Sequence, residues 1–429
     1  MNLVTIISHD LGRTLGCYGV EGVRSPNIDA LAADALQIDN AFCVAPQCSP
    51  SRAAMWTGRY PHANGVVGLC HGDFRNDLHA DEIHLAQILK AEGYTTWLHG
   101  DQHETRDPAR LGFDYIDNPF SADPTADGFV KQMEAYDGKK PFFAEICFFE
   151  PHRPFPTSDD IEIRAEGTMP LPAYLPDLPV LREDFAAFEA SIATLDRAVG
   201  RVFDAIKAAG AWDDTLIVFT ADHGIPFPQA KMTLYDAGLE VPLIVRIPGG
   251  TSGERSPAVF TNIDFTPTIL ELMGLSHPGE KPCHGVPRAA VLRGEDRIGA
   301  PEVFGEKTYH TYYDPMRCIR ADGWKLIANF ERAPIQECSP DFDNNAHGYP
   351  ETIEALGLGN YHPPFELFDL KTDPQEQINL AENPAHTKKL HDLKKRLLNW
   401  MRESEDPLLD GPIPSAAYQD RLKMLQSNT

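Results

Sequence analysis

The feature that most constrains this fold is a series of short apolar runs separated by amphipathic segments. The runs "LVTIIS", "YTTWLHG", "PFFAEICFF", "TLIVFTADHG" and "VPLIVRIPG" have the length and residue content of buried strands. Helical spacing occurs between them, in "SPNIDALAADAL", "EIHLAQILKAEG" and the segment from Asp184 to Ala209. Strands that alternate with helices predict an α/β fold with a doubly wound, mainly parallel sheet and helices on both faces.

The pattern changes after about residue 305. "PMRCIRADGWKLIANF" alternates like two strands joined by a turn at "ADG", and "FELFDL" reads as a further strand. "TKKLHDLKKRLLNWMRESED" is an amphipathic helix. We therefore predict a larger domain over residues 1–308 that carries the site. A small C-terminal α+β subdomain with an antiparallel sheet is predicted over residues 309–429.

The acidic composition limits the expected partners. The chain has 63 acidic against 38 basic residues, a formal net charge of −25. Such a surface repels nucleic acid and anionic membranes, so we expect neither as a partner. No apolar run approaches the ~20 residues of a membrane helix. Met1 leads directly into a strand without a signal-peptide pattern, and the eight cysteines are scattered. We expect a reduced, cytoplasmic protein and leave a homo-oligomer open.

Polar clusters follow four of the predicted strands. "SHD", "HGDQHE", "EPHRP" and "ADHG" each come at the end of an apolar run. In open α/β sheets, ligands bind at the carboxyl ends of the strands. The sequence therefore predicts one site assembled from four distant segments.

Two of these clusters carry metal-ligand chemistry. Asp10 and Asp222 offer hard oxygens, and His9 and His223 offer imidazole nitrogens. Such a mixed set suits Mn²⁺ or Zn²⁺ as well as Ca²⁺ or Mg²⁺. An aspartate at a strand end is also a common helix cap or turn residue, so each position alone is weak evidence.

Cys48 opens the segment "CSPSRAAMWTGR". Pro50 predicts the start of a helix, which places Cys48 beside free backbone N–H groups at the positive helix end. Arg52 returns one turn later. That environment lowers the pKa of a thiol and also binds an anion. The alternative interpretation is a half-buried structural cysteine.

The segment "CSPSRAAMWTGR" resembles the signature of the formylglycine-dependent sulfatases, C-x-P-S-R followed by T-G-R. The resemblance continues through "SPNIDALA", "GYTTWLHGDQH", "EPHRPF", "TLIVFTADHG", "TNIDFTPTILELMG" and "FELFDLKTDPQEQINLAENP". It implies an alkaline-phosphatase-like core with a small C-terminal sheet subdomain. "HGIPFPQAKMTLYDAGLEVPLIV" and "YYDPMRCIR" look most like the heparan N-sulfatase (sulfamidase) branch.

The resemblance implies that a formylglycine-generating maturase oxidises Cys48 to formylglycine (3-oxoalanine). One hydroxyl of the hydrated aldehyde, bound to a divalent metal, would attack sulfur. The second hydroxyl would then lose a proton, which re-forms the aldehyde and expels sulfate. A plain Ser or Cys lacks that second hydroxyl. Ca²⁺ is the first expectation for the metal, with Mn²⁺, Mg²⁺ or Zn²⁺ as alternatives. The substrate would be a sulfated small molecule or oligosaccharide.

The resemblance also implies roles for single residues. The metal ligands would be residue 48 together with Asp10, Asp222 and His223, and His9 is a further candidate. The catalytic groups would be Cys48, Arg52 (holding the diol), His103 (the base), and His152 and Lys231 (binding sulfate and protonating the leaving group). The candidate substrate contacts are Arg153, His310, Tyr312 and Arg317. The ordinary alternatives are a solvated surface lysine for Lys231 and a turn residue for His152.

The chain departs from the family pattern in three segments. His9 precedes Asp10 where many members have two aspartates, and "GDQH" places Asp101 where a lysine is usual. Asp101 would have to point away, pair with a cation such as Arg106, or contact another part of the substrate. "TLYDAGLEVP" carries Asp236 and Glu240 where an acidic and then a basic residue are common.

Three functions compete. The first is a sulfatase that cleaves a sulfate ester or an N-sulfate of a sugar. The second is a phosphonate monoester or phosphodiester hydrolase with the same formylglycine and metal, which the missing lysine at position 101 keeps open. The third is a silent binding protein with an unmodified Cys48. The metal-site carboxylates together with Arg52 and His103 argue against it.

Overall fold

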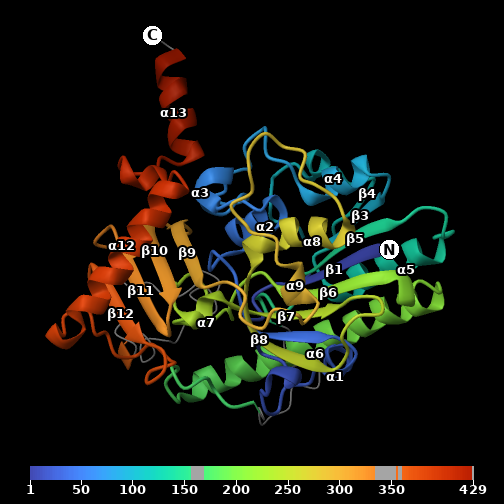
Figure 1. The fold of residues 1–429 in the computed structure, drawn as a ribbon, viewed down its shortest axis with the longest axis horizontal. Coiled ribbons are helices and arrows are strands. Elements are labelled where there is room, and N and C mark those ends of the chain that lie inside the picture. The colour runs from blue at the N-terminus through green and yellow to red at the C-terminus, as the bar shows by residue number, and fades with distance from the viewer. Residues whose placement is uncertain (156–168, 334–353, 356–359, 428–429) are drawn as a thin grey trace.

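The computed structural model describes residues 1–155, 169–333, 354–355 and 360–427. These residues form an eight-stranded sheet in a larger body and a four-stranded sheet in a smaller body beside it (Figure 1). The predicted fold class is therefore confirmed.

The larger sheet is parallel at every pairing except those of β7, which runs antiparallel to both of its neighbours. In spatial order, its strands are β4 (Tyr115–Asp117), β3 (Thr95–Gly100), β5 (Phe142–Phe148), β1 (Asn2–Ser8), β6 (Thr215–Ala221), β7 (Glu240–Arg246), β2 (Leu36–Phe42) and β8 (Glu254–Thr261). The central strands β5, β1 and β6 are buried along their whole length. This burial explains why they read as continuous apolar runs.

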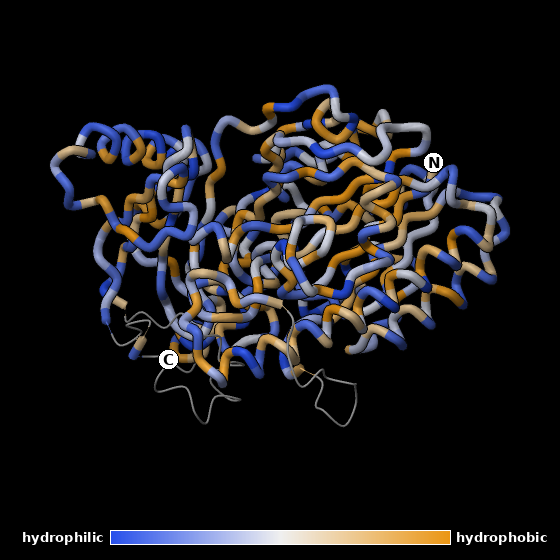
Figure 2. The backbone as a smooth tube through the Cα atoms, turned by 90° about the horizontal axis from the view of Figure 1, so that it is seen from below, coloured by the Kyte–Doolittle hydropathy of each residue, from blue (hydrophilic) through white to orange (hydrophobic). Residues whose placement is uncertain are grey.

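Helices cover both faces of the larger sheet (Figure 1). On one face, α6 (Pro179–Ala208) packs against α1 (Pro26–Ala33) and α5 (Ala122–Glu134). On the other face, α2 (Cys48–Thr57) packs against α8 (Phe265–Met273), and α4 (Leu85–Ala91) packs on β3. Figure 2 shows the strands of this sheet as a largely hydrophobic layer inside the helices. Further helices are α3 (Pro61–Asn64), α7 (Asp236–Leu239), α9 (Ala289–Leu292) and α13 (Ala416–Ser427).

The smaller sheet is antiparallel. In spatial order, its strands are β12 (Phe365–Asp369), β11 (Trp324–Asn329), β10 (Tyr313–Ala321) and β9 (Glu302–Tyr309). Asp322 and Gly323 both have positive φ, as the predicted tight turn at "ADG" requires. Helix α12 (Thr387–Glu403) packs on β10 and β11. Strand β9 begins at Glu302, before the expected domain boundary at 308/309. That boundary stays a prediction.

One predicted helix was too long. α1 ends at Ala33, and Leu36 is the first residue of β2, a strand that the spacing did not predict. β2 pairs with both β7 and β8. The partners that stabilise it lie about two hundred residues away, so local spacing could not indicate them.

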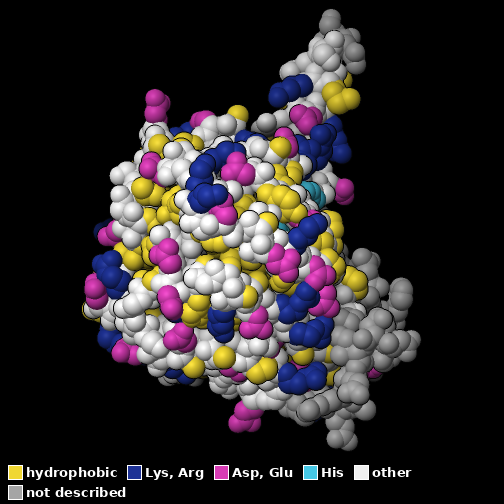
Figure 3. All heavy atoms as spheres, turned by 90° about the vertical axis from the view of Figure 1, so that its right-hand side faces the viewer, with side chains coloured by type: hydrophobic (Ala, Val, Ile, Leu, Met, Phe, Trp, Pro, Cys, Tyr) yellow, Lys and Arg dark blue, Asp and Glu magenta, His cyan; other side chains and the backbone are white. Residues whose placement is uncertain are grey.

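The surface carries mixed charge. On the face shown in Figure 3, basic and acidic side chains are interspersed. No helix within the described ranges is both long enough and apolar enough to span a bilayer.

Candidate active site

Four adjacent parallel strands bring the predicted polar clusters together. β3, β5, β1 and β6 are neighbours in the sheet, and their carboxyl ends share one edge. The segments that follow them carry Asp101 and His103, then His152, then His9 and Asp10, then Asp222 and His223. Gly100 ends β3 with φ +86°, and an added Cβ there would lie 1.9 Å from the Cys147 carbonyl oxygen. A glycine is therefore required where the chain turns towards Asp101.

Cys48 is the first residue of α2, two positions earlier than the predicted helix start at Pro50. Its side chain is buried, with Sγ 3.3 Å from His223 Nε2 and 4.0 Å from Asp10 Oδ1. Burial alone raises the pKa of the thiol. Lys231, His223 and a hydrogen bond with His103 outweigh this effect and hold the pKa well below its usual value. The residue therefore has the surroundings of a reactive group.

Arg52 lies one turn further along α2 and is fully buried. Its Nε donates to Asp222 Oδ2 at 3.1 Å, and Nη1 donates to the Asp101 carbonyl at 3.4 Å. Arg52 thus ties the start of α2 to the ends of β6 and β3.

Asp10, Asp222 and His223 form the acidic side of the site. Asp10 Oδ1 lies 3.0 Å from His223 Nε2, and the Asp10 N–H donates to Asp222 Oδ1 at 3.0 Å. His223 Nδ1 donates to the Gly224 carbonyl at 3.0 Å, which leaves Nε2 facing Asp10. Burial raises the pKa of both carboxyl groups, but surrounding cations lower it well below the usual range. The two acidic groups raise the pKa of His223 to about 10 against the effect of burial.

The donor set fits a divalent cation. One ligand atom each of His9, Asp10, Cys48 and Asp222 lies within 4.8 Å of the others, and all four residues are buried. Among the described residues neither nitrogen of His9 makes a well-aligned hydrogen bond, although Nδ1 lies 3.0 Å from Asp222 Oδ2 and Nε2 lies 3.5 Å from Asp101 Oδ2. Two carboxylates and an imidazole nitrogen are ligands that such ions accept.

Lys231 is buried beside Asp10, so the surface alternative for this lysine is wrong. Its Nζ donates to Asp10 Oδ2 at 2.7 Å and lies 3.2 Å from His152 Nε2. Burial, followed by the charge of Lys231, lowers the pKa of His152. The two side chains therefore form a basic pair next to the acidic cluster.

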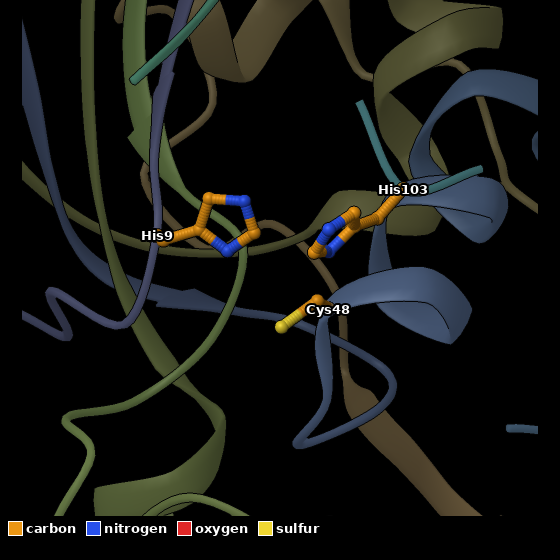
Figure 4. Close-up of side chains that lie close together, drawn as sticks. All are labelled: His9, Cys48 and His103. Carbon is orange, nitrogen blue, oxygen red and sulfur yellow. The ribbon is translucent and has the colours of Figure 1, made fainter. Parts of the chain in front are cut away.

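Asp101 lies between two histidines. Its Oδ2 is 3.1 Å from His103 Nε2 and 3.5 Å from His9 Nε2. Arg106 instead faces Asp77, with its Nε 3.5 Å from Oδ2. Figure 4 shows the His9 and His103 rings approaching Cys48 from separate segments. Of the three alternatives for Asp101, the structure excludes the pairing with Arg106, because the two histidines are its near partners.

Comparison with known proteins agrees with this arrangement. Residues 1–275 match the Sulfatase family model, which is more than half of the chain. The chain belongs to the sulfatase family. Residues 226–345 of this sulfatase also match the family model described as N-sulphoglucosamine sulphohydrolase, C-terminal.

Individual relatives cover most of the sulfatase chain. Human N-sulphoglucosamine sulphohydrolase is 29% identical, over 96% of this chain and 92% of its own. A solved enzyme in complex with its substrate D-glucosamine-2-N,6-O-disulfate superposes with a TM-score of 0.73 at 20% identity, covering 94% of this chain and 98% of its own. The phosphonate monoester hydrolase of Agrobacterium radiobacter superposes with a TM-score of 0.71 at 21% identity, covering 95% and 97%. These structural likenesses show the alkaline-phosphatase-like fold.

The predicted substrate contacts of the sulfatase are scattered. Arg153 is buried and forms an ion pair with Asp184, with Nη1 2.8 Å from Oδ1. Its guanidinium also stacks on Phe155, 4.2 Å from the ring centroid. His310 and Tyr312 are partly exposed in the turn between β9 and β10, where their role stays a prediction.

Arg317 does not lie in the catalytic cluster. It is fully buried in β10, and its Nε donates to Asp406 Oδ2 at 2.6 Å. This position corrects the prediction of a substrate contact, because the guanidinium is enclosed by the smaller sheet and the segment after α12.

Cations from distant segments explain the acidic residues of "TLYDAGLEVP". Asp236 lies 2.6 Å from Lys325 Nζ and 3.0 Å from Arg320 Nε. Glu240 lies 2.5 Å from Arg13 Nη2. The basic partners are present in this sulfatase, but on other elements.

The sequence reasoning missed two features of the site. His71 is exposed, and its ring centroid lies 5.2 Å from that of His103. No motif surrounds it in "LCHGD". The pairing of Asp101 with His103 had a signal, since the two residues flank Gln102 in "GDQH".

Proposed function

We propose that this sulfatase hydrolyses the N-sulfate or a sulfate ester of a sulfated sugar, through formylglycine made from Cys48 and a divalent metal, with Ca²⁺ as the first choice. The position of Cys48 carries the proposal. It starts a helix, lies next to Asp10 and His223, and is flanked by the Lys231–His152 pair. The match to the C-terminal model of N-sulphoglucosamine sulphohydrolase supports the N-sulfate reading.

The formylglycine supplies two hydroxyl groups on one carbon, and the metal supplies positive charge beside them. Asp10, Asp222, His223 and His9 would hold the metal. Arg52 keeps Asp222 in place through its 3.1 Å hydrogen bond. In this proposal these residues would hold residue 48 in one orientation for attack on sulfur.

In this proposal two histidines handle the protons of the reaction. His103 is held by Asp101 at Nε2 and bonds residue 48, so it accepts a proton from a hydroxyl at that position. His152 and Lys231 bind a sulfuryl oxygen and protonate the leaving atom. An N-sulfate needs this proton most, because an unprotonated amine anion is a poor leaving group. The maturase that converts Cys48 is part of the proposal as a partner.

A substrate panel tests the proposal. Converted protein is assayed with glucosamine N-sulfate, an aryl sulfate and a phosphonate monoester, with Cys48→Ala as the control. The highest kcat/KM is expected for the N-sulfate, and no turnover is expected for Cys48→Ala. Much faster turnover of the phosphonate would favour the alternative hydrolase, which the superposition on the Agrobacterium radiobacter enzyme keeps in view.

A further inference from the structure

A second ligand cluster lies beside Cys48. One ligand atom from each of His9, Cys48 and His103 lies within 4.8 Å of the other two. Figure 4 shows these three side chains converging from the segments after β1 and β3 and from the start of α2. Unlike the group with Asp10 and Asp222, this cluster has no carboxylate member. It consists of two imidazoles and a sulfur.

The ring nitrogens of this cluster lack well-aligned hydrogen bonds to oxygen or nitrogen. Within the described residues both nitrogens of His9 are buried without one, although Nδ1 lies 3.0 Å from Asp222 Oδ2 and Nε2 lies 3.5 Å from Asp101 Oδ2. His103 Nδ1 is also buried without an oxygen or nitrogen partner there, and the His103 side chain instead bonds Cys48 within the cluster. Buried polar atoms in native proteins are nearly always satisfied, so several poorly bonded nitrogens in one place favour a bound ion.

Asp101 supplies the outer support that such a site needs. Its Oδ2 faces the Nε2 atoms of His103 and His9, at 3.1 and 3.5 Å. This arrangement leaves the Nδ1 atoms of the two rings as the candidate ligands, and the Nδ1 of His9 also lies 3.0 Å from Asp222 Oδ2. A carboxylate behind a metal-binding histidine fixes the ring and makes it a better ligand. The aspartate at position 101, where the family usually has a lysine, therefore has a chemical explanation, since its carboxylate supports two imidazoles.

We propose that the unmodified protein, with Cys48 still a thiol, binds Zn²⁺ through His9, Cys48 and His103, with Asp101 as the outer carboxylate. Two nitrogens and a thiolate are ligands that Zn²⁺ prefers, and they leave a fourth tetrahedral position open. Ca²⁺ and Mg²⁺ prefer oxygen and disfavour this set. Binding releases the thiol proton to solvent and involves no oxidation or reduction.

The proposal gives the modification of Cys48 a second consequence. Replacing sulfur by oxygen removes the soft ligand, after which residue 48 matches the oxygen-rich group with Asp10 and Asp222. Conversion would then change the metal preference of the site from Zn²⁺ to a harder ion. This consequence rests on the proposed function, whereas the Zn²⁺ site of the unmodified chain does not.

Cobalt spectroscopy tests the site directly. Full-length protein made without a maturase and stripped of metal is titrated with Co²⁺, the spectroscopic substitute for Zn²⁺. One equivalent should produce a thiolate-to-cobalt charge-transfer band and the intense visible bands of a tetrahedral site, and Zn²⁺ should abolish both. Cys48→Ser should lack the charge-transfer band. Absence of that band in the unaltered protein at saturating Co²⁺ would overturn the proposal.

A matched pair of variants locates the ion. His103 and His223 both face Cys48, but only His103 belongs to the proposed cluster. His103→Ala should abolish the band and His223→Ala should keep it. Asp101→Asn should weaken Zn²⁺ binding by about 10–100-fold. Loss of the band in His223→Ala but not in His103→Ala would place the ion in the carboxylate group and refute the proposal. Circular dichroism confirms folding, and His103→Gln replaces any alanine variant that fails to fold. No step needs turnover, so these results are independent of the sulfatase assay.

Discussion

Replacing Arg317 by methionine distinguishes a structural role from substrate contact. Methionine has a similar length and apolar stem but no donors. In the native protein the guanidinium donates to both carboxylate oxygens of Asp406, at 2.6 and 3.1 Å. Its Nη1 adds bonds to the carbonyls of Lys307 and Met316 at 3.0 and 2.9 Å.

The burial of this ion pair sets the magnitude. Both side chains have no exposed area, so solvent cannot replace the lost partner. Removing one member of a buried pair costs about 3–5 kcal/mol, because it leaves an uncompensated charge. We therefore expect the free energy of unfolding of Arg317→Met to fall by about 3–5 kcal/mol. The double variant Arg317→Met/Asp406→Leu should recover much of this loss, since the unpaired carboxylate of Asp406 is gone.

Urea unfolding monitored by tryptophan fluorescence gives these free energies. The KM of the folded single variant for glucosamine N-sulfate should equal that of the unaltered protein. A loss of under ~1 kcal/mol, the size of an exposed pair, together with a raised KM would refute the reasoning. That result would return Arg317 to the substrate site.

Three further predictions concern the site and its support. Lys231→Met should lower kcat/KM by about 10²–10³-fold, because it removes the cation that contacts Asp10. The control variant Lys139→Met changes an exposed lysine and should have no effect. An unchanged rate in Lys231→Met would contradict a catalytic role for Lys231. Burial lowers the pKa of His62, but the charge of Glu306 outweighs burial and raises this pKa. The protonated His62–Glu306 pair therefore contributes its full stabilisation of the fold below about pH 6.5, and this contribution is lost as the pH rises through the raised pKa. Thermal melting should therefore show a steeper loss of stability above that pH for the unaltered protein than for His62→Gln, and parallel curves would refute this. His9→Ala should lower the metal content of converted protein, measured by elemental analysis, and unchanged content would remove His9 from the ligand set.

The sequence predicted the site because parallel strands obey a simple spatial rule. His9, Asp101, His152 and Asp222 each follow an apolar run, and the rule places such strand ends on one edge. The structure confirms that β1, β3, β5 and β6 are neighbours. The strand order itself depends on contacts between distant segments, and local periodicity does not contain it.

Partner choice was the part that the sequence could not predict. Lys325 lies 89 positions after Asp236, yet their side chains are 2.6 Å apart. Arginine side chains are usually exposed, so the alternating pattern of this strand did not indicate that Arg317 is buried. Only the packing of the segment after α12 shows its burial. The sequence likewise could not predict that Asp101 faces His9, because His9 follows a different strand.

The central claim is that the aldehyde formed from Cys48 carries out sulfate hydrolysis. Its most direct test uses protein preparations with graded maturation. Peptide mass spectrometry gives the fraction of chains in which Cys48 is an aldehyde, and ion chromatography gives the rate of sulfate release from glucosamine N-sulfate in the same samples. The rate should rise in proportion to the converted fraction and extrapolate to zero for fully unmodified protein. A rate that does not depend on the converted fraction would contradict the account.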